Sequence, residues 1–138
     1  MVTEADLIAC ASALVGEFRT SRGCAAGSVA AAILTRNGAV YTGICLDTAC
    51  SIGFCAEHAA VAEMLKARES EIALVVAVTT AGVIPPCGRC RELMWQVDTR
   101  NRAAGVIIAP STVVPLAELL PHPWCAPEVD IEQGRTSN

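Results

Sequence analysis

The pattern of hydrophobic and polar positions first indicates a helix near the N-terminus. Leu7, Ala11, Leu14 and Phe18 recur at a spacing that would place them on one helical face. Thr3 stands just before them and can cap the first turn. We therefore expect a helix over residues 4–18 that packs on the core through these four side chains.

Four runs of Ala, Val, Ile and Leu predict β-strands over residues 28–34, 39–45, 72–80 and 104–109. The first two runs are separated by Asn37-Gly38, which is typical of a tight hairpin because both residues tolerate positive φ. Small and polar residues predict loops over 20–27 and 47–54, and a turn over 82–86.

Three further helices are expected over residues 55–68, 87–97 and 115–120. Val61 and Leu65 give the first of these an apolar stripe, and Pro85 and Pro86 prevent helix before the second. A helix and a hairpin followed by alternating helices and strands predict a mixed sheet with helices on both faces.

Composition indicates one domain with an aliphatic core, because the chain has 138 residues, 53% of them hydrophobic and only 4% aromatic. The net charge is -4 and no basic run is present, which argues against a nucleic-acid groove. The start of the chain does not have the pattern of a signal peptide, and no apolar stretch reaches about 18 residues. We expect a cytoplasmic protein that contacts neither nucleic acid nor membrane. In a reducing compartment its eight cysteines indicate metal binding or buried thiols.

Two short motifs carry the candidate chemistry: Cys55-Ala56-Glu57 and Pro86-Cys87-Gly88-Arg89-Cys90. Cys55, Cys87 and Cys90 offer three thiolates, and a catalytic zinc site takes three protein ligands and keeps one position open. Each motif falls at a predicted helix start, where unpaired N–H groups carry partial positive charge. We therefore predict one Zn²⁺ per subunit, held where two helix starts meet.

Glu57 lies two residues after the first predicted ligand and is the candidate proton shuttle. Arg89 is placed to temper the charge of the thiolates. Two other interpretations stay open, a structural zinc site and a redox Cys-x-x-Cys pair. Only one Cys-x-x-Cys pair is present, and the first ligand is followed by an acid, so we prefer the catalytic interpretation.

The motifs resemble those of the cytidine deaminase superfamily, in its small three-cysteine branch of cytidine deaminases and blasticidin-S deaminases. The resemblance extends over about residues 5–124 and includes Ser28-Val29-Ala30-Ala31-Ala32, Asn37-Gly38, Tyr41-Thr42-Gly43, the two cysteine motifs and Leu119-Leu120-Pro121. It implies a three-layer α/β/α sandwich with a mixed five-stranded sheet, hydrolytic deamination and a homotetramer. We expect a single domain over residues 1–124 and a polar C-terminal tail over 125–138.

The same resemblance implies the substrate positions, and here the chain departs from the family. The family's ribose-binding Asn and Glu fall on Cys45 and Asp47, and the Phe of its pyrimidine pocket falls on Gly27. Ala56 and the backbone around Pro86 are expected to contact the substrate. His58 stands where many relatives carry a charge-neutralising Arg, and it either faces the thiolates or lies on a helix surface or interface.

Trp124 stands where blasticidin-S deaminases have a C-terminal aromatic residue. It either stacks on a base across a subunit boundary or packs a helix end.

We therefore expect a zinc-dependent hydrolase that uses water to release ammonia from a small aminated substrate. The substrate is a cytosine-type nucleoside or an analogue, such as cytidine, deoxycytidine or blasticidin S. The alternatives are the same chemistry on another aminated heterocycle, such as a free base, guanine or a triazine, and a zinc-stabilised binding protein without turnover.

Overall fold

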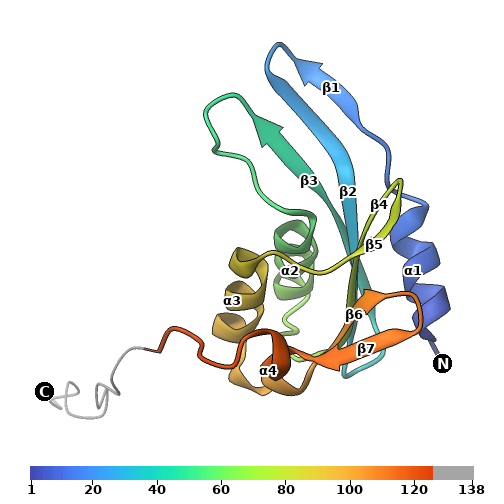
Figure 1. Ribbon diagram of the computed structural model, residues 1–138, viewed down its shortest axis with the longest axis vertical. Helices are drawn as coiled ribbons and strands as arrows, with labels where there is room; N and C mark the ends of the chain where they lie inside the picture. Colours follow the sequence, from blue (N-terminus) through green and yellow to red (C-terminus); the bar gives the residue numbers. More distant parts are fainter. Residues whose placement is uncertain (126–138) are drawn as a thin grey trace, which may run out of the picture.

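The computed structural model describes residues 1–125 and contains helices on both sides of one mixed sheet (Figure 1). The elements in chain order are α1 Glu4–Ser12, β1 Phe18–Ser21, β2 Cys24–Thr35, β3 Val40–Thr48, α2 Ala56–Lys66, β4 Ile72–Thr79, β5 Gly82–Ile84, α3 Gly88–Val97, the 3-10 helix η1 Thr99–Ala103, β6 Gly105–Ala109, β7 Thr112–Pro115 and α4 Leu116–Leu119.

The centre of the sheet is five strands wide, in the order β3-β2-β4-β6-β7. The parallel pair is β4 with β6, and the other described pairs are antiparallel. Two short strands bring the total in the described residues to seven. Strand β1 pairs with the same edge of β2 as β4 does, at an earlier part of β2. Strand β5 pairs with the same edge of β4 as β6 does, at a later part of β4. The mixed sheet with flanking helices confirms the predicted fold class.

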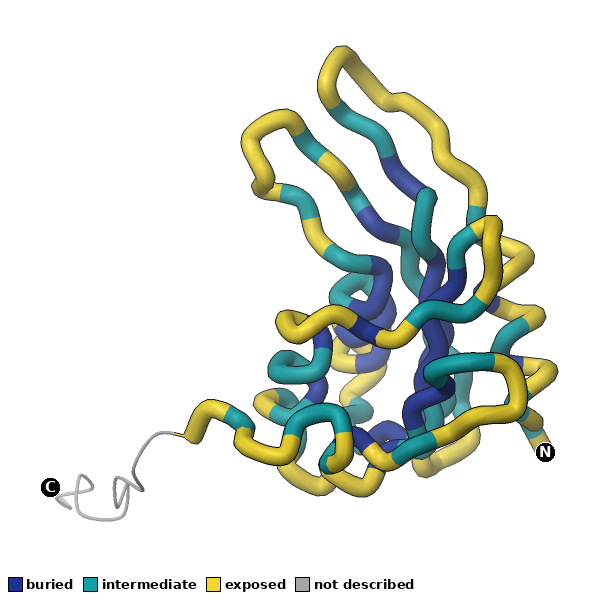
Figure 2. The backbone as a smooth tube through the Cα atoms, in the orientation of Figure 1, coloured by how far each residue is buried: buried dark blue, intermediate teal, exposed yellow. Residues whose placement is uncertain are grey.

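The two faces of the sheet are covered by different helices, α1 on one side and α2 with α3 on the other (Figure 1). Successive residues of β2 point to opposite faces, as in any strand. Ala30 and Ala32 therefore pack in the cluster under α1, while Ala31 and Ile33 pack in the cluster under α2 and α3. The buried residues of the central strands lie between these layers (Figure 2).

Helix α2 approaches the sheet closely because β3 carries Gly43 beneath it. A Cβ atom at Gly43 would lie 2.4 Å from the backbone nitrogen of Ala60 and 2.6 Å from the carbonyl oxygen of Ala56. Both distances are far inside normal van der Waals contact, so only glycine fits unless the helix moves away. This contact fixes the first turn of α2, where one of the two cysteine motifs lies.

The N-terminal helix is shorter than predicted and ends at Ser12. Leu7 and Ala11 are buried as expected, but Leu14 and Phe18 are 45% and 52% exposed. The chain leaves the helix because its backbone pairs with β2: the N–H of Gly16 donates to the carbonyl of Gly27, and Phe18 faces Ala26 across β1 and β2. The predicted cap is confirmed, since the Thr3 hydroxyl accepts the N–H of Asp6.

The region predicted as a loop over residues 20–27 is instead a hairpin between β1 and β2. Strands β5 and β7 were also missing from the prediction. Helices α2, α3 and α4 begin within a residue or so of their predicted starts, with Pro115 as the cap of α4. The predicted tail lies outside the described residues apart from Cys125, and no described helix is long and apolar enough to span a membrane.

Asn101, in η1, is fully buried and ties three segments together. Its carbonyl oxygen accepts the N–H of Ile72 at 2.7 Å, and its amide donates to the carbonyls of Ser70 at 3.0 Å and Met94 at 2.9 Å. These bonds join the end of α3 to the start of β4, so they hold α3 in place against the sheet.

Replacing Asn101 with Ala should lower the free energy of unfolding by roughly 2–5 kcal/mol, because buried backbone groups would lose their partners. Urea unfolding followed by circular dichroism would measure the change. Arg102→Ala, at the exposed neighbouring position, is the matched control and should change stability little. Equal stability of the two variants would contradict this account of Asn101.

Candidate active site

A cavity of about 480 Å³ opens beside the starts of α2 and α3. Its walls come from four segments: residues 28–29 of β2, residues 45–48 at the end of β3, Ser51 and residues 53–57 before and in the first turn of α2, and Ile84, Pro85, Cys87 and Arg89 from the end of β5 to the start of α3. The two cysteine motifs found in the sequence therefore reach one cavity from two different helices.

The three predicted thiol ligands lie together at one end of this region. Cys55 is the N-cap of α2 and Cys87 is the N-cap of α3, and their Sγ atoms are 3.5 Å apart. Cys90 lies one turn into α3, with its Sγ 3.5 Å from that of Cys87. Two sulfur ligands of a tetrahedral zinc, each about 2.3 Å from the ion, would be about 3.8 Å apart. The donor set and its spacing thus fit zinc.

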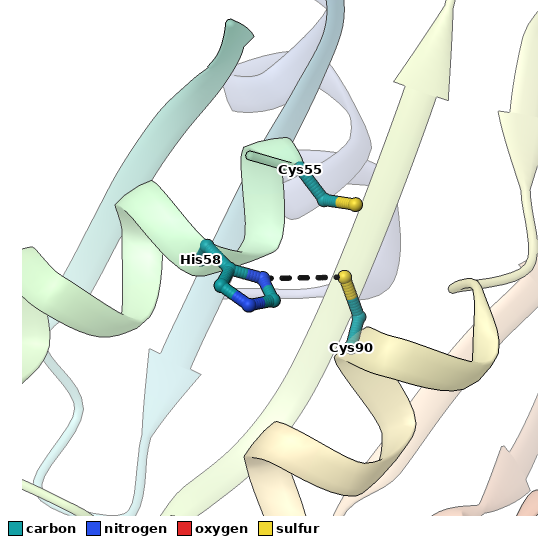
Figure 3. Close-up of side chains that lie close together, drawn as sticks. All are labelled: Cys55, His58 and Cys90. Carbon is teal, nitrogen blue, oxygen red and sulfur yellow. Dashed lines mark hydrogen bonds between the residues drawn. The ribbon is translucent and has the colours of Figure 1, made fainter. Parts of the chain in front are cut away.

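A fourth candidate donor, His58, lies beside Cys90. Its Nδ1 is 3.6 Å from the Cys90 Sγ, and the donor atoms of Cys55, His58 and Cys90 all lie within 4.8 Å of one another (Figure 3). Cys55, Cys87 and Glu57 line the cavity, whereas His58 and Cys90 do not. His58 therefore contacts the sulfur cluster at Cys90 without lining the cavity.

The thiols differ in acidity because their surroundings differ. Burial, together with the charge of Glu57, raises the pKa of Cys90, and burial raises the pKa of Cys55. Burial also acts to raise the pKa of Cys87, but hydrogen bonds from the N–H groups of Cys90 and Arg89 and with the thiols of Cys55 and Cys90 together outweigh it and lower the pKa overall. The Cys87 thiol is thus the easiest of the three to deprotonate.

Burial and the nearby Arg89 charge lower the pKa of His58. The imidazole is therefore neutral at neutral pH and offers Cys90 a hydrogen bond without a full positive charge. Arg89 itself lines the cavity and is exposed. Of the two residues predicted to temper the thiolate charge, Arg89 is the one that supplies a cation.

Glu57 occupies the first turn of α2 and is only 4% exposed, yet it lines the cavity. Within the described part of the chain no hydrogen bond or ion pair to its carboxylate is found. Its charge raises the pKa of both Cys55 and Cys90, so the carboxylate lies near the sulfur cluster. A buried carboxylate with unused acceptor capacity beside a metal-type site can exchange protons with a molecule in the cavity.

Three of the five predicted substrate positions line the cavity and two do not. Cys45, Asp47 and Ala56 line the cavity. Pro86 is buried outside the lining, and its carbonyl accepts a hydrogen bond from the Arg91 Nε at 2.8 Å.

Trp124 is 67% exposed and also lies outside the cavity lining. Its backbone is held on α3, where the N–H donates to Glu92 and the carbonyl accepts from Gln96. Its ring therefore does not reach the cavity of its own chain.

Ser28 is a cavity residue that the sequence reasoning did not select. Its Oγ lies 3.2 Å from the Cys45 Sγ and 3.4 Å from the Asp47 Oδ2. In the sequence Ser28 appeared only within the segment Ser28-Val29-Ala30-Ala31-Ala32 that resembles the family. The preceding Gly27 is buried with φ +85°, and a Cβ there would lie 2.5 Å from the carbonyl oxygen of Gly16. A larger residue such as Phe cannot occupy this position without moving the backbone.

Comparison with known proteins links this arrangement to one family, although no family model matches the chain. A cytidine deaminase from Halalkalibacterium halodurans is 31% identical over 108 residues, which cover 74% of this chain and 80% of that protein. Among solved structures, a cytidine deaminase from Burkholderia pseudomallei is 28% identical with a TM-score of 0.70, covering 88% of this chain and 99% of that one. A mutant cytidine deaminase from Mycobacterium tuberculosis shares the fold with a TM-score of 0.75 at 24% identity, covering 91% of this chain and 100% of that one. The chain belongs to the cytidine deaminase family.

Proposed function

We propose that the protein is a zinc-dependent hydrolytic deaminase that releases ammonia from a cytosine-type nucleoside or nucleoside analogue, such as cytidine, deoxycytidine or blasticidin S. The observation that carries the proposal is a cluster of three thiols, two of which line a single cavity together with one buried carboxylate. Membership of the cytidine deaminase family supports the reaction class.

In this proposal Cys55, Cys87 and Cys90 hold the metal, with Arg89 on the cavity side of the cluster. Zinc bound by these thiolates would supply water activated for attack near neutral pH. His58 would support Cys90 through the Nδ1 contact and not serve as a ligand, because it does not line the cavity.

Glu57 moves the protons. Its carboxylate takes a proton as water attacks the ring carbon that bears the amine, and gives protons to the ring nitrogen and to the departing ammonia. A position that is nearly buried but open to the cavity keeps these transfers away from bulk solvent.

The substrate is less closely specified than the reaction. Ala56 and the polar wall of Cys45 and Asp47 would contact it, but Cys45 is a poor replacement for an amide that both donates and accepts. This difference favours the second candidate, the same chemistry on another aminated heterocycle. A zinc-stabilised binding protein is the third, and the retained Glu57 argues against it.

We also propose that the protein works in the cytoplasm as a homotetramer. Exposed apolar side chains support association: Ile52 and Phe54, in the loop before α2, are 76% and 39% exposed, and Phe54 lines the cavity. Trp124, which is exposed and whose backbone is hydrogen-bonded to α3, could then meet the cavity of a neighbouring subunit.

Metal analysis of purified variants should separate ligands from supporting residues. Cys87→Ala should lose most of the zinc, whereas His58→Ala should keep about one zinc per chain because His58 is assigned as a support of Cys90 and not as a ligand. Cys10→Ala, an exposed thiol on α1, is the control and should keep its zinc. Loss of zinc in His58→Ala equal to that in Cys87→Ala would make His58 a ligand and close the site.

Glu57→Gln should keep zinc and the fold but lower the turnover number by about 10²–10⁴-fold, because the amide cannot carry the protons. Ammonia release from cytidine, deoxycytidine, cytosine, blasticidin S, guanine and an aminated triazine would measure activity. Glu63→Gln, on the exposed side of the same helix, is the control. No ammonia from any of these compounds with zinc-loaded wild-type protein would contradict the proposed reaction.

A further inference from the structure

One wall of the cavity is polar and takes no part in the proton transfers of the proposed reaction. It consists of Ser28 on β2 with Cys45 and Asp47 on β3. Strand β2 is irregular here, since its pairing advances four residues from Ala26 to Ala30 while β3 advances only two. This bulge begins at Gly27 and brings Ser28 to the cavity, beside Cys45 and Asp47.

Cys45 serves to hold this wall together. It is only 5% exposed, and its sulfur accepts the N–H of Val29 at 3.3 Å and lies 3.2 Å from the Ser28 hydroxyl. Its thiol also lies 3.8 Å from the Asp47 Oδ2. With its sulfur engaged by three neighbours, Cys45 fixes the bulge and has little capacity left for a ligand.

Asp47 and Ser28 are the groups that this wall presents to a ligand. Asp47 is exposed, and both of its wall contacts reach Oδ2. Among residues 1–125 neither a hydrogen bond to its Oδ1 nor an ion pair to its carboxylate is found. The Oδ1 atom and the second lone pair of the Ser28 hydroxyl can therefore accept hydrogen bonds from a bound molecule.

The charges around the cavity favour a hydrogen-bond donor that is also positively charged. Its lining includes two carboxylates, Asp47 and Glu57, against one cation, Arg89. Three thiolates on a divalent ion would add one further negative charge. A positively charged group near Asp47 is therefore attracted, and a phosphate in the same place is repelled.

We propose that Ser28 and Asp47, positioned by Cys45, select substrates by the charge of the group attached to the aminated ring. An ammonium is preferred over a neutral hydroxyl, and a phosphate is rejected. This inference rests on the proposed function, because it is the proposed reaction that places the aminated ring of the substrate beside Glu57.

Binding to zinc-loaded Glu57→Gln protein tests the selection separately from turnover. Isothermal titration calorimetry would compare 5′-amino-5′-deoxycytidine, cytidine and cytidine 5′-monophosphate. We expect the ammonium compound to bind about tenfold or more tightly than cytidine, and the phosphate at least about tenfold more weakly, as for charge pairs near a protein surface.

Second substitutions in Glu57→Gln protein test whether the preference for the ammonium compound comes from the wall of Ser28, Cys45 and Asp47. Asp47→Asn should bring the affinities for the ammonium compound and cytidine to within about twofold, and Ser28→Ala should weaken both compounds several-fold. Cys45→Ser, which keeps a small hydroxyl in place of the thiol, should retain most of the preference, and Cys45→Leu should remove it. Glu118→Gln removes an exposed charge on α4 and should leave the preference unchanged.

The inference is overturned if cytidine binds as tightly as the ammonium compound, if the preference survives Asp47→Asn, or if none of the three compounds binds. Failure of the proposed function has a different signature. Wild-type protein would then release no ammonia from any compound, while the ranking in binding would persist.

Discussion

The candidate site depends on the convergence of two helix starts at one point. Cys55 and Cys87 occupy the N-cap positions of α2 and α3, and neither side chain makes a regular capping hydrogen bond. Ser, Thr, Asp or Asn at such a position typically stabilises a helix by about 0.5–2 kcal/mol. Cysteine gives up that stabilisation, and its sulfur points instead to the neighbouring helix start, 3.5 Å away. The rest of the fold holds these two starts in place: Gly43 lets α2 lie close on β3, and Asn101 ties the end of α3 to β4.

The sequence predicted the parts of the fold that depend on local pattern. Helices α2 and α3 have apolar stripes and clear starts, and β4 is a run of branched residues buried between two layers. Strands β1, β5 and β7 were missed because they are three or four residues long and none of their residues is buried, so no burial pattern marks them. Their formation depends on backbone pairing with strands far along the chain, as when Gly16 and Phe18 pair with β2 instead of extending α1. Sequence periodicity contains no information about such pairing.

The candidate site likewise contains residues that the sequence indicated and residues that only the folded structure reveals. Cys55 and Glu57 share one helix start, and Cys87 and Cys90 share the other, so their spacing alone indicated a common purpose. Ser28 is 17 residues from Cys45 and reaches it only through a bulge in β2, a feature of the folded sheet. The position of His58 was open for a related reason: a residue next to Glu57 on a helix can face the metal or the solvent. Only the packing of α2 against α3 brings its ring to Cys90.

Electrostatics explain why such a site favours a bound cation. Cys90 is fully buried, and the nearby charge of Glu57 adds to the effect of burial in raising its pKa. Two ionised groups with like charge are costly in so dry a place, so the metal-free site keeps Cys90 protonated. A bound dication would reverse this balance, because it would stabilise the thiolates. Three thiolates on such an ion would still leave one surplus negative charge, which Arg89 on the cavity side, the N–H groups at the start of α3 and the imidazole of His58 beside Cys90 would offset in part. The arrangement of helix starts that collects the sulfurs thus also supplies part of the positive potential that lets them ionise together.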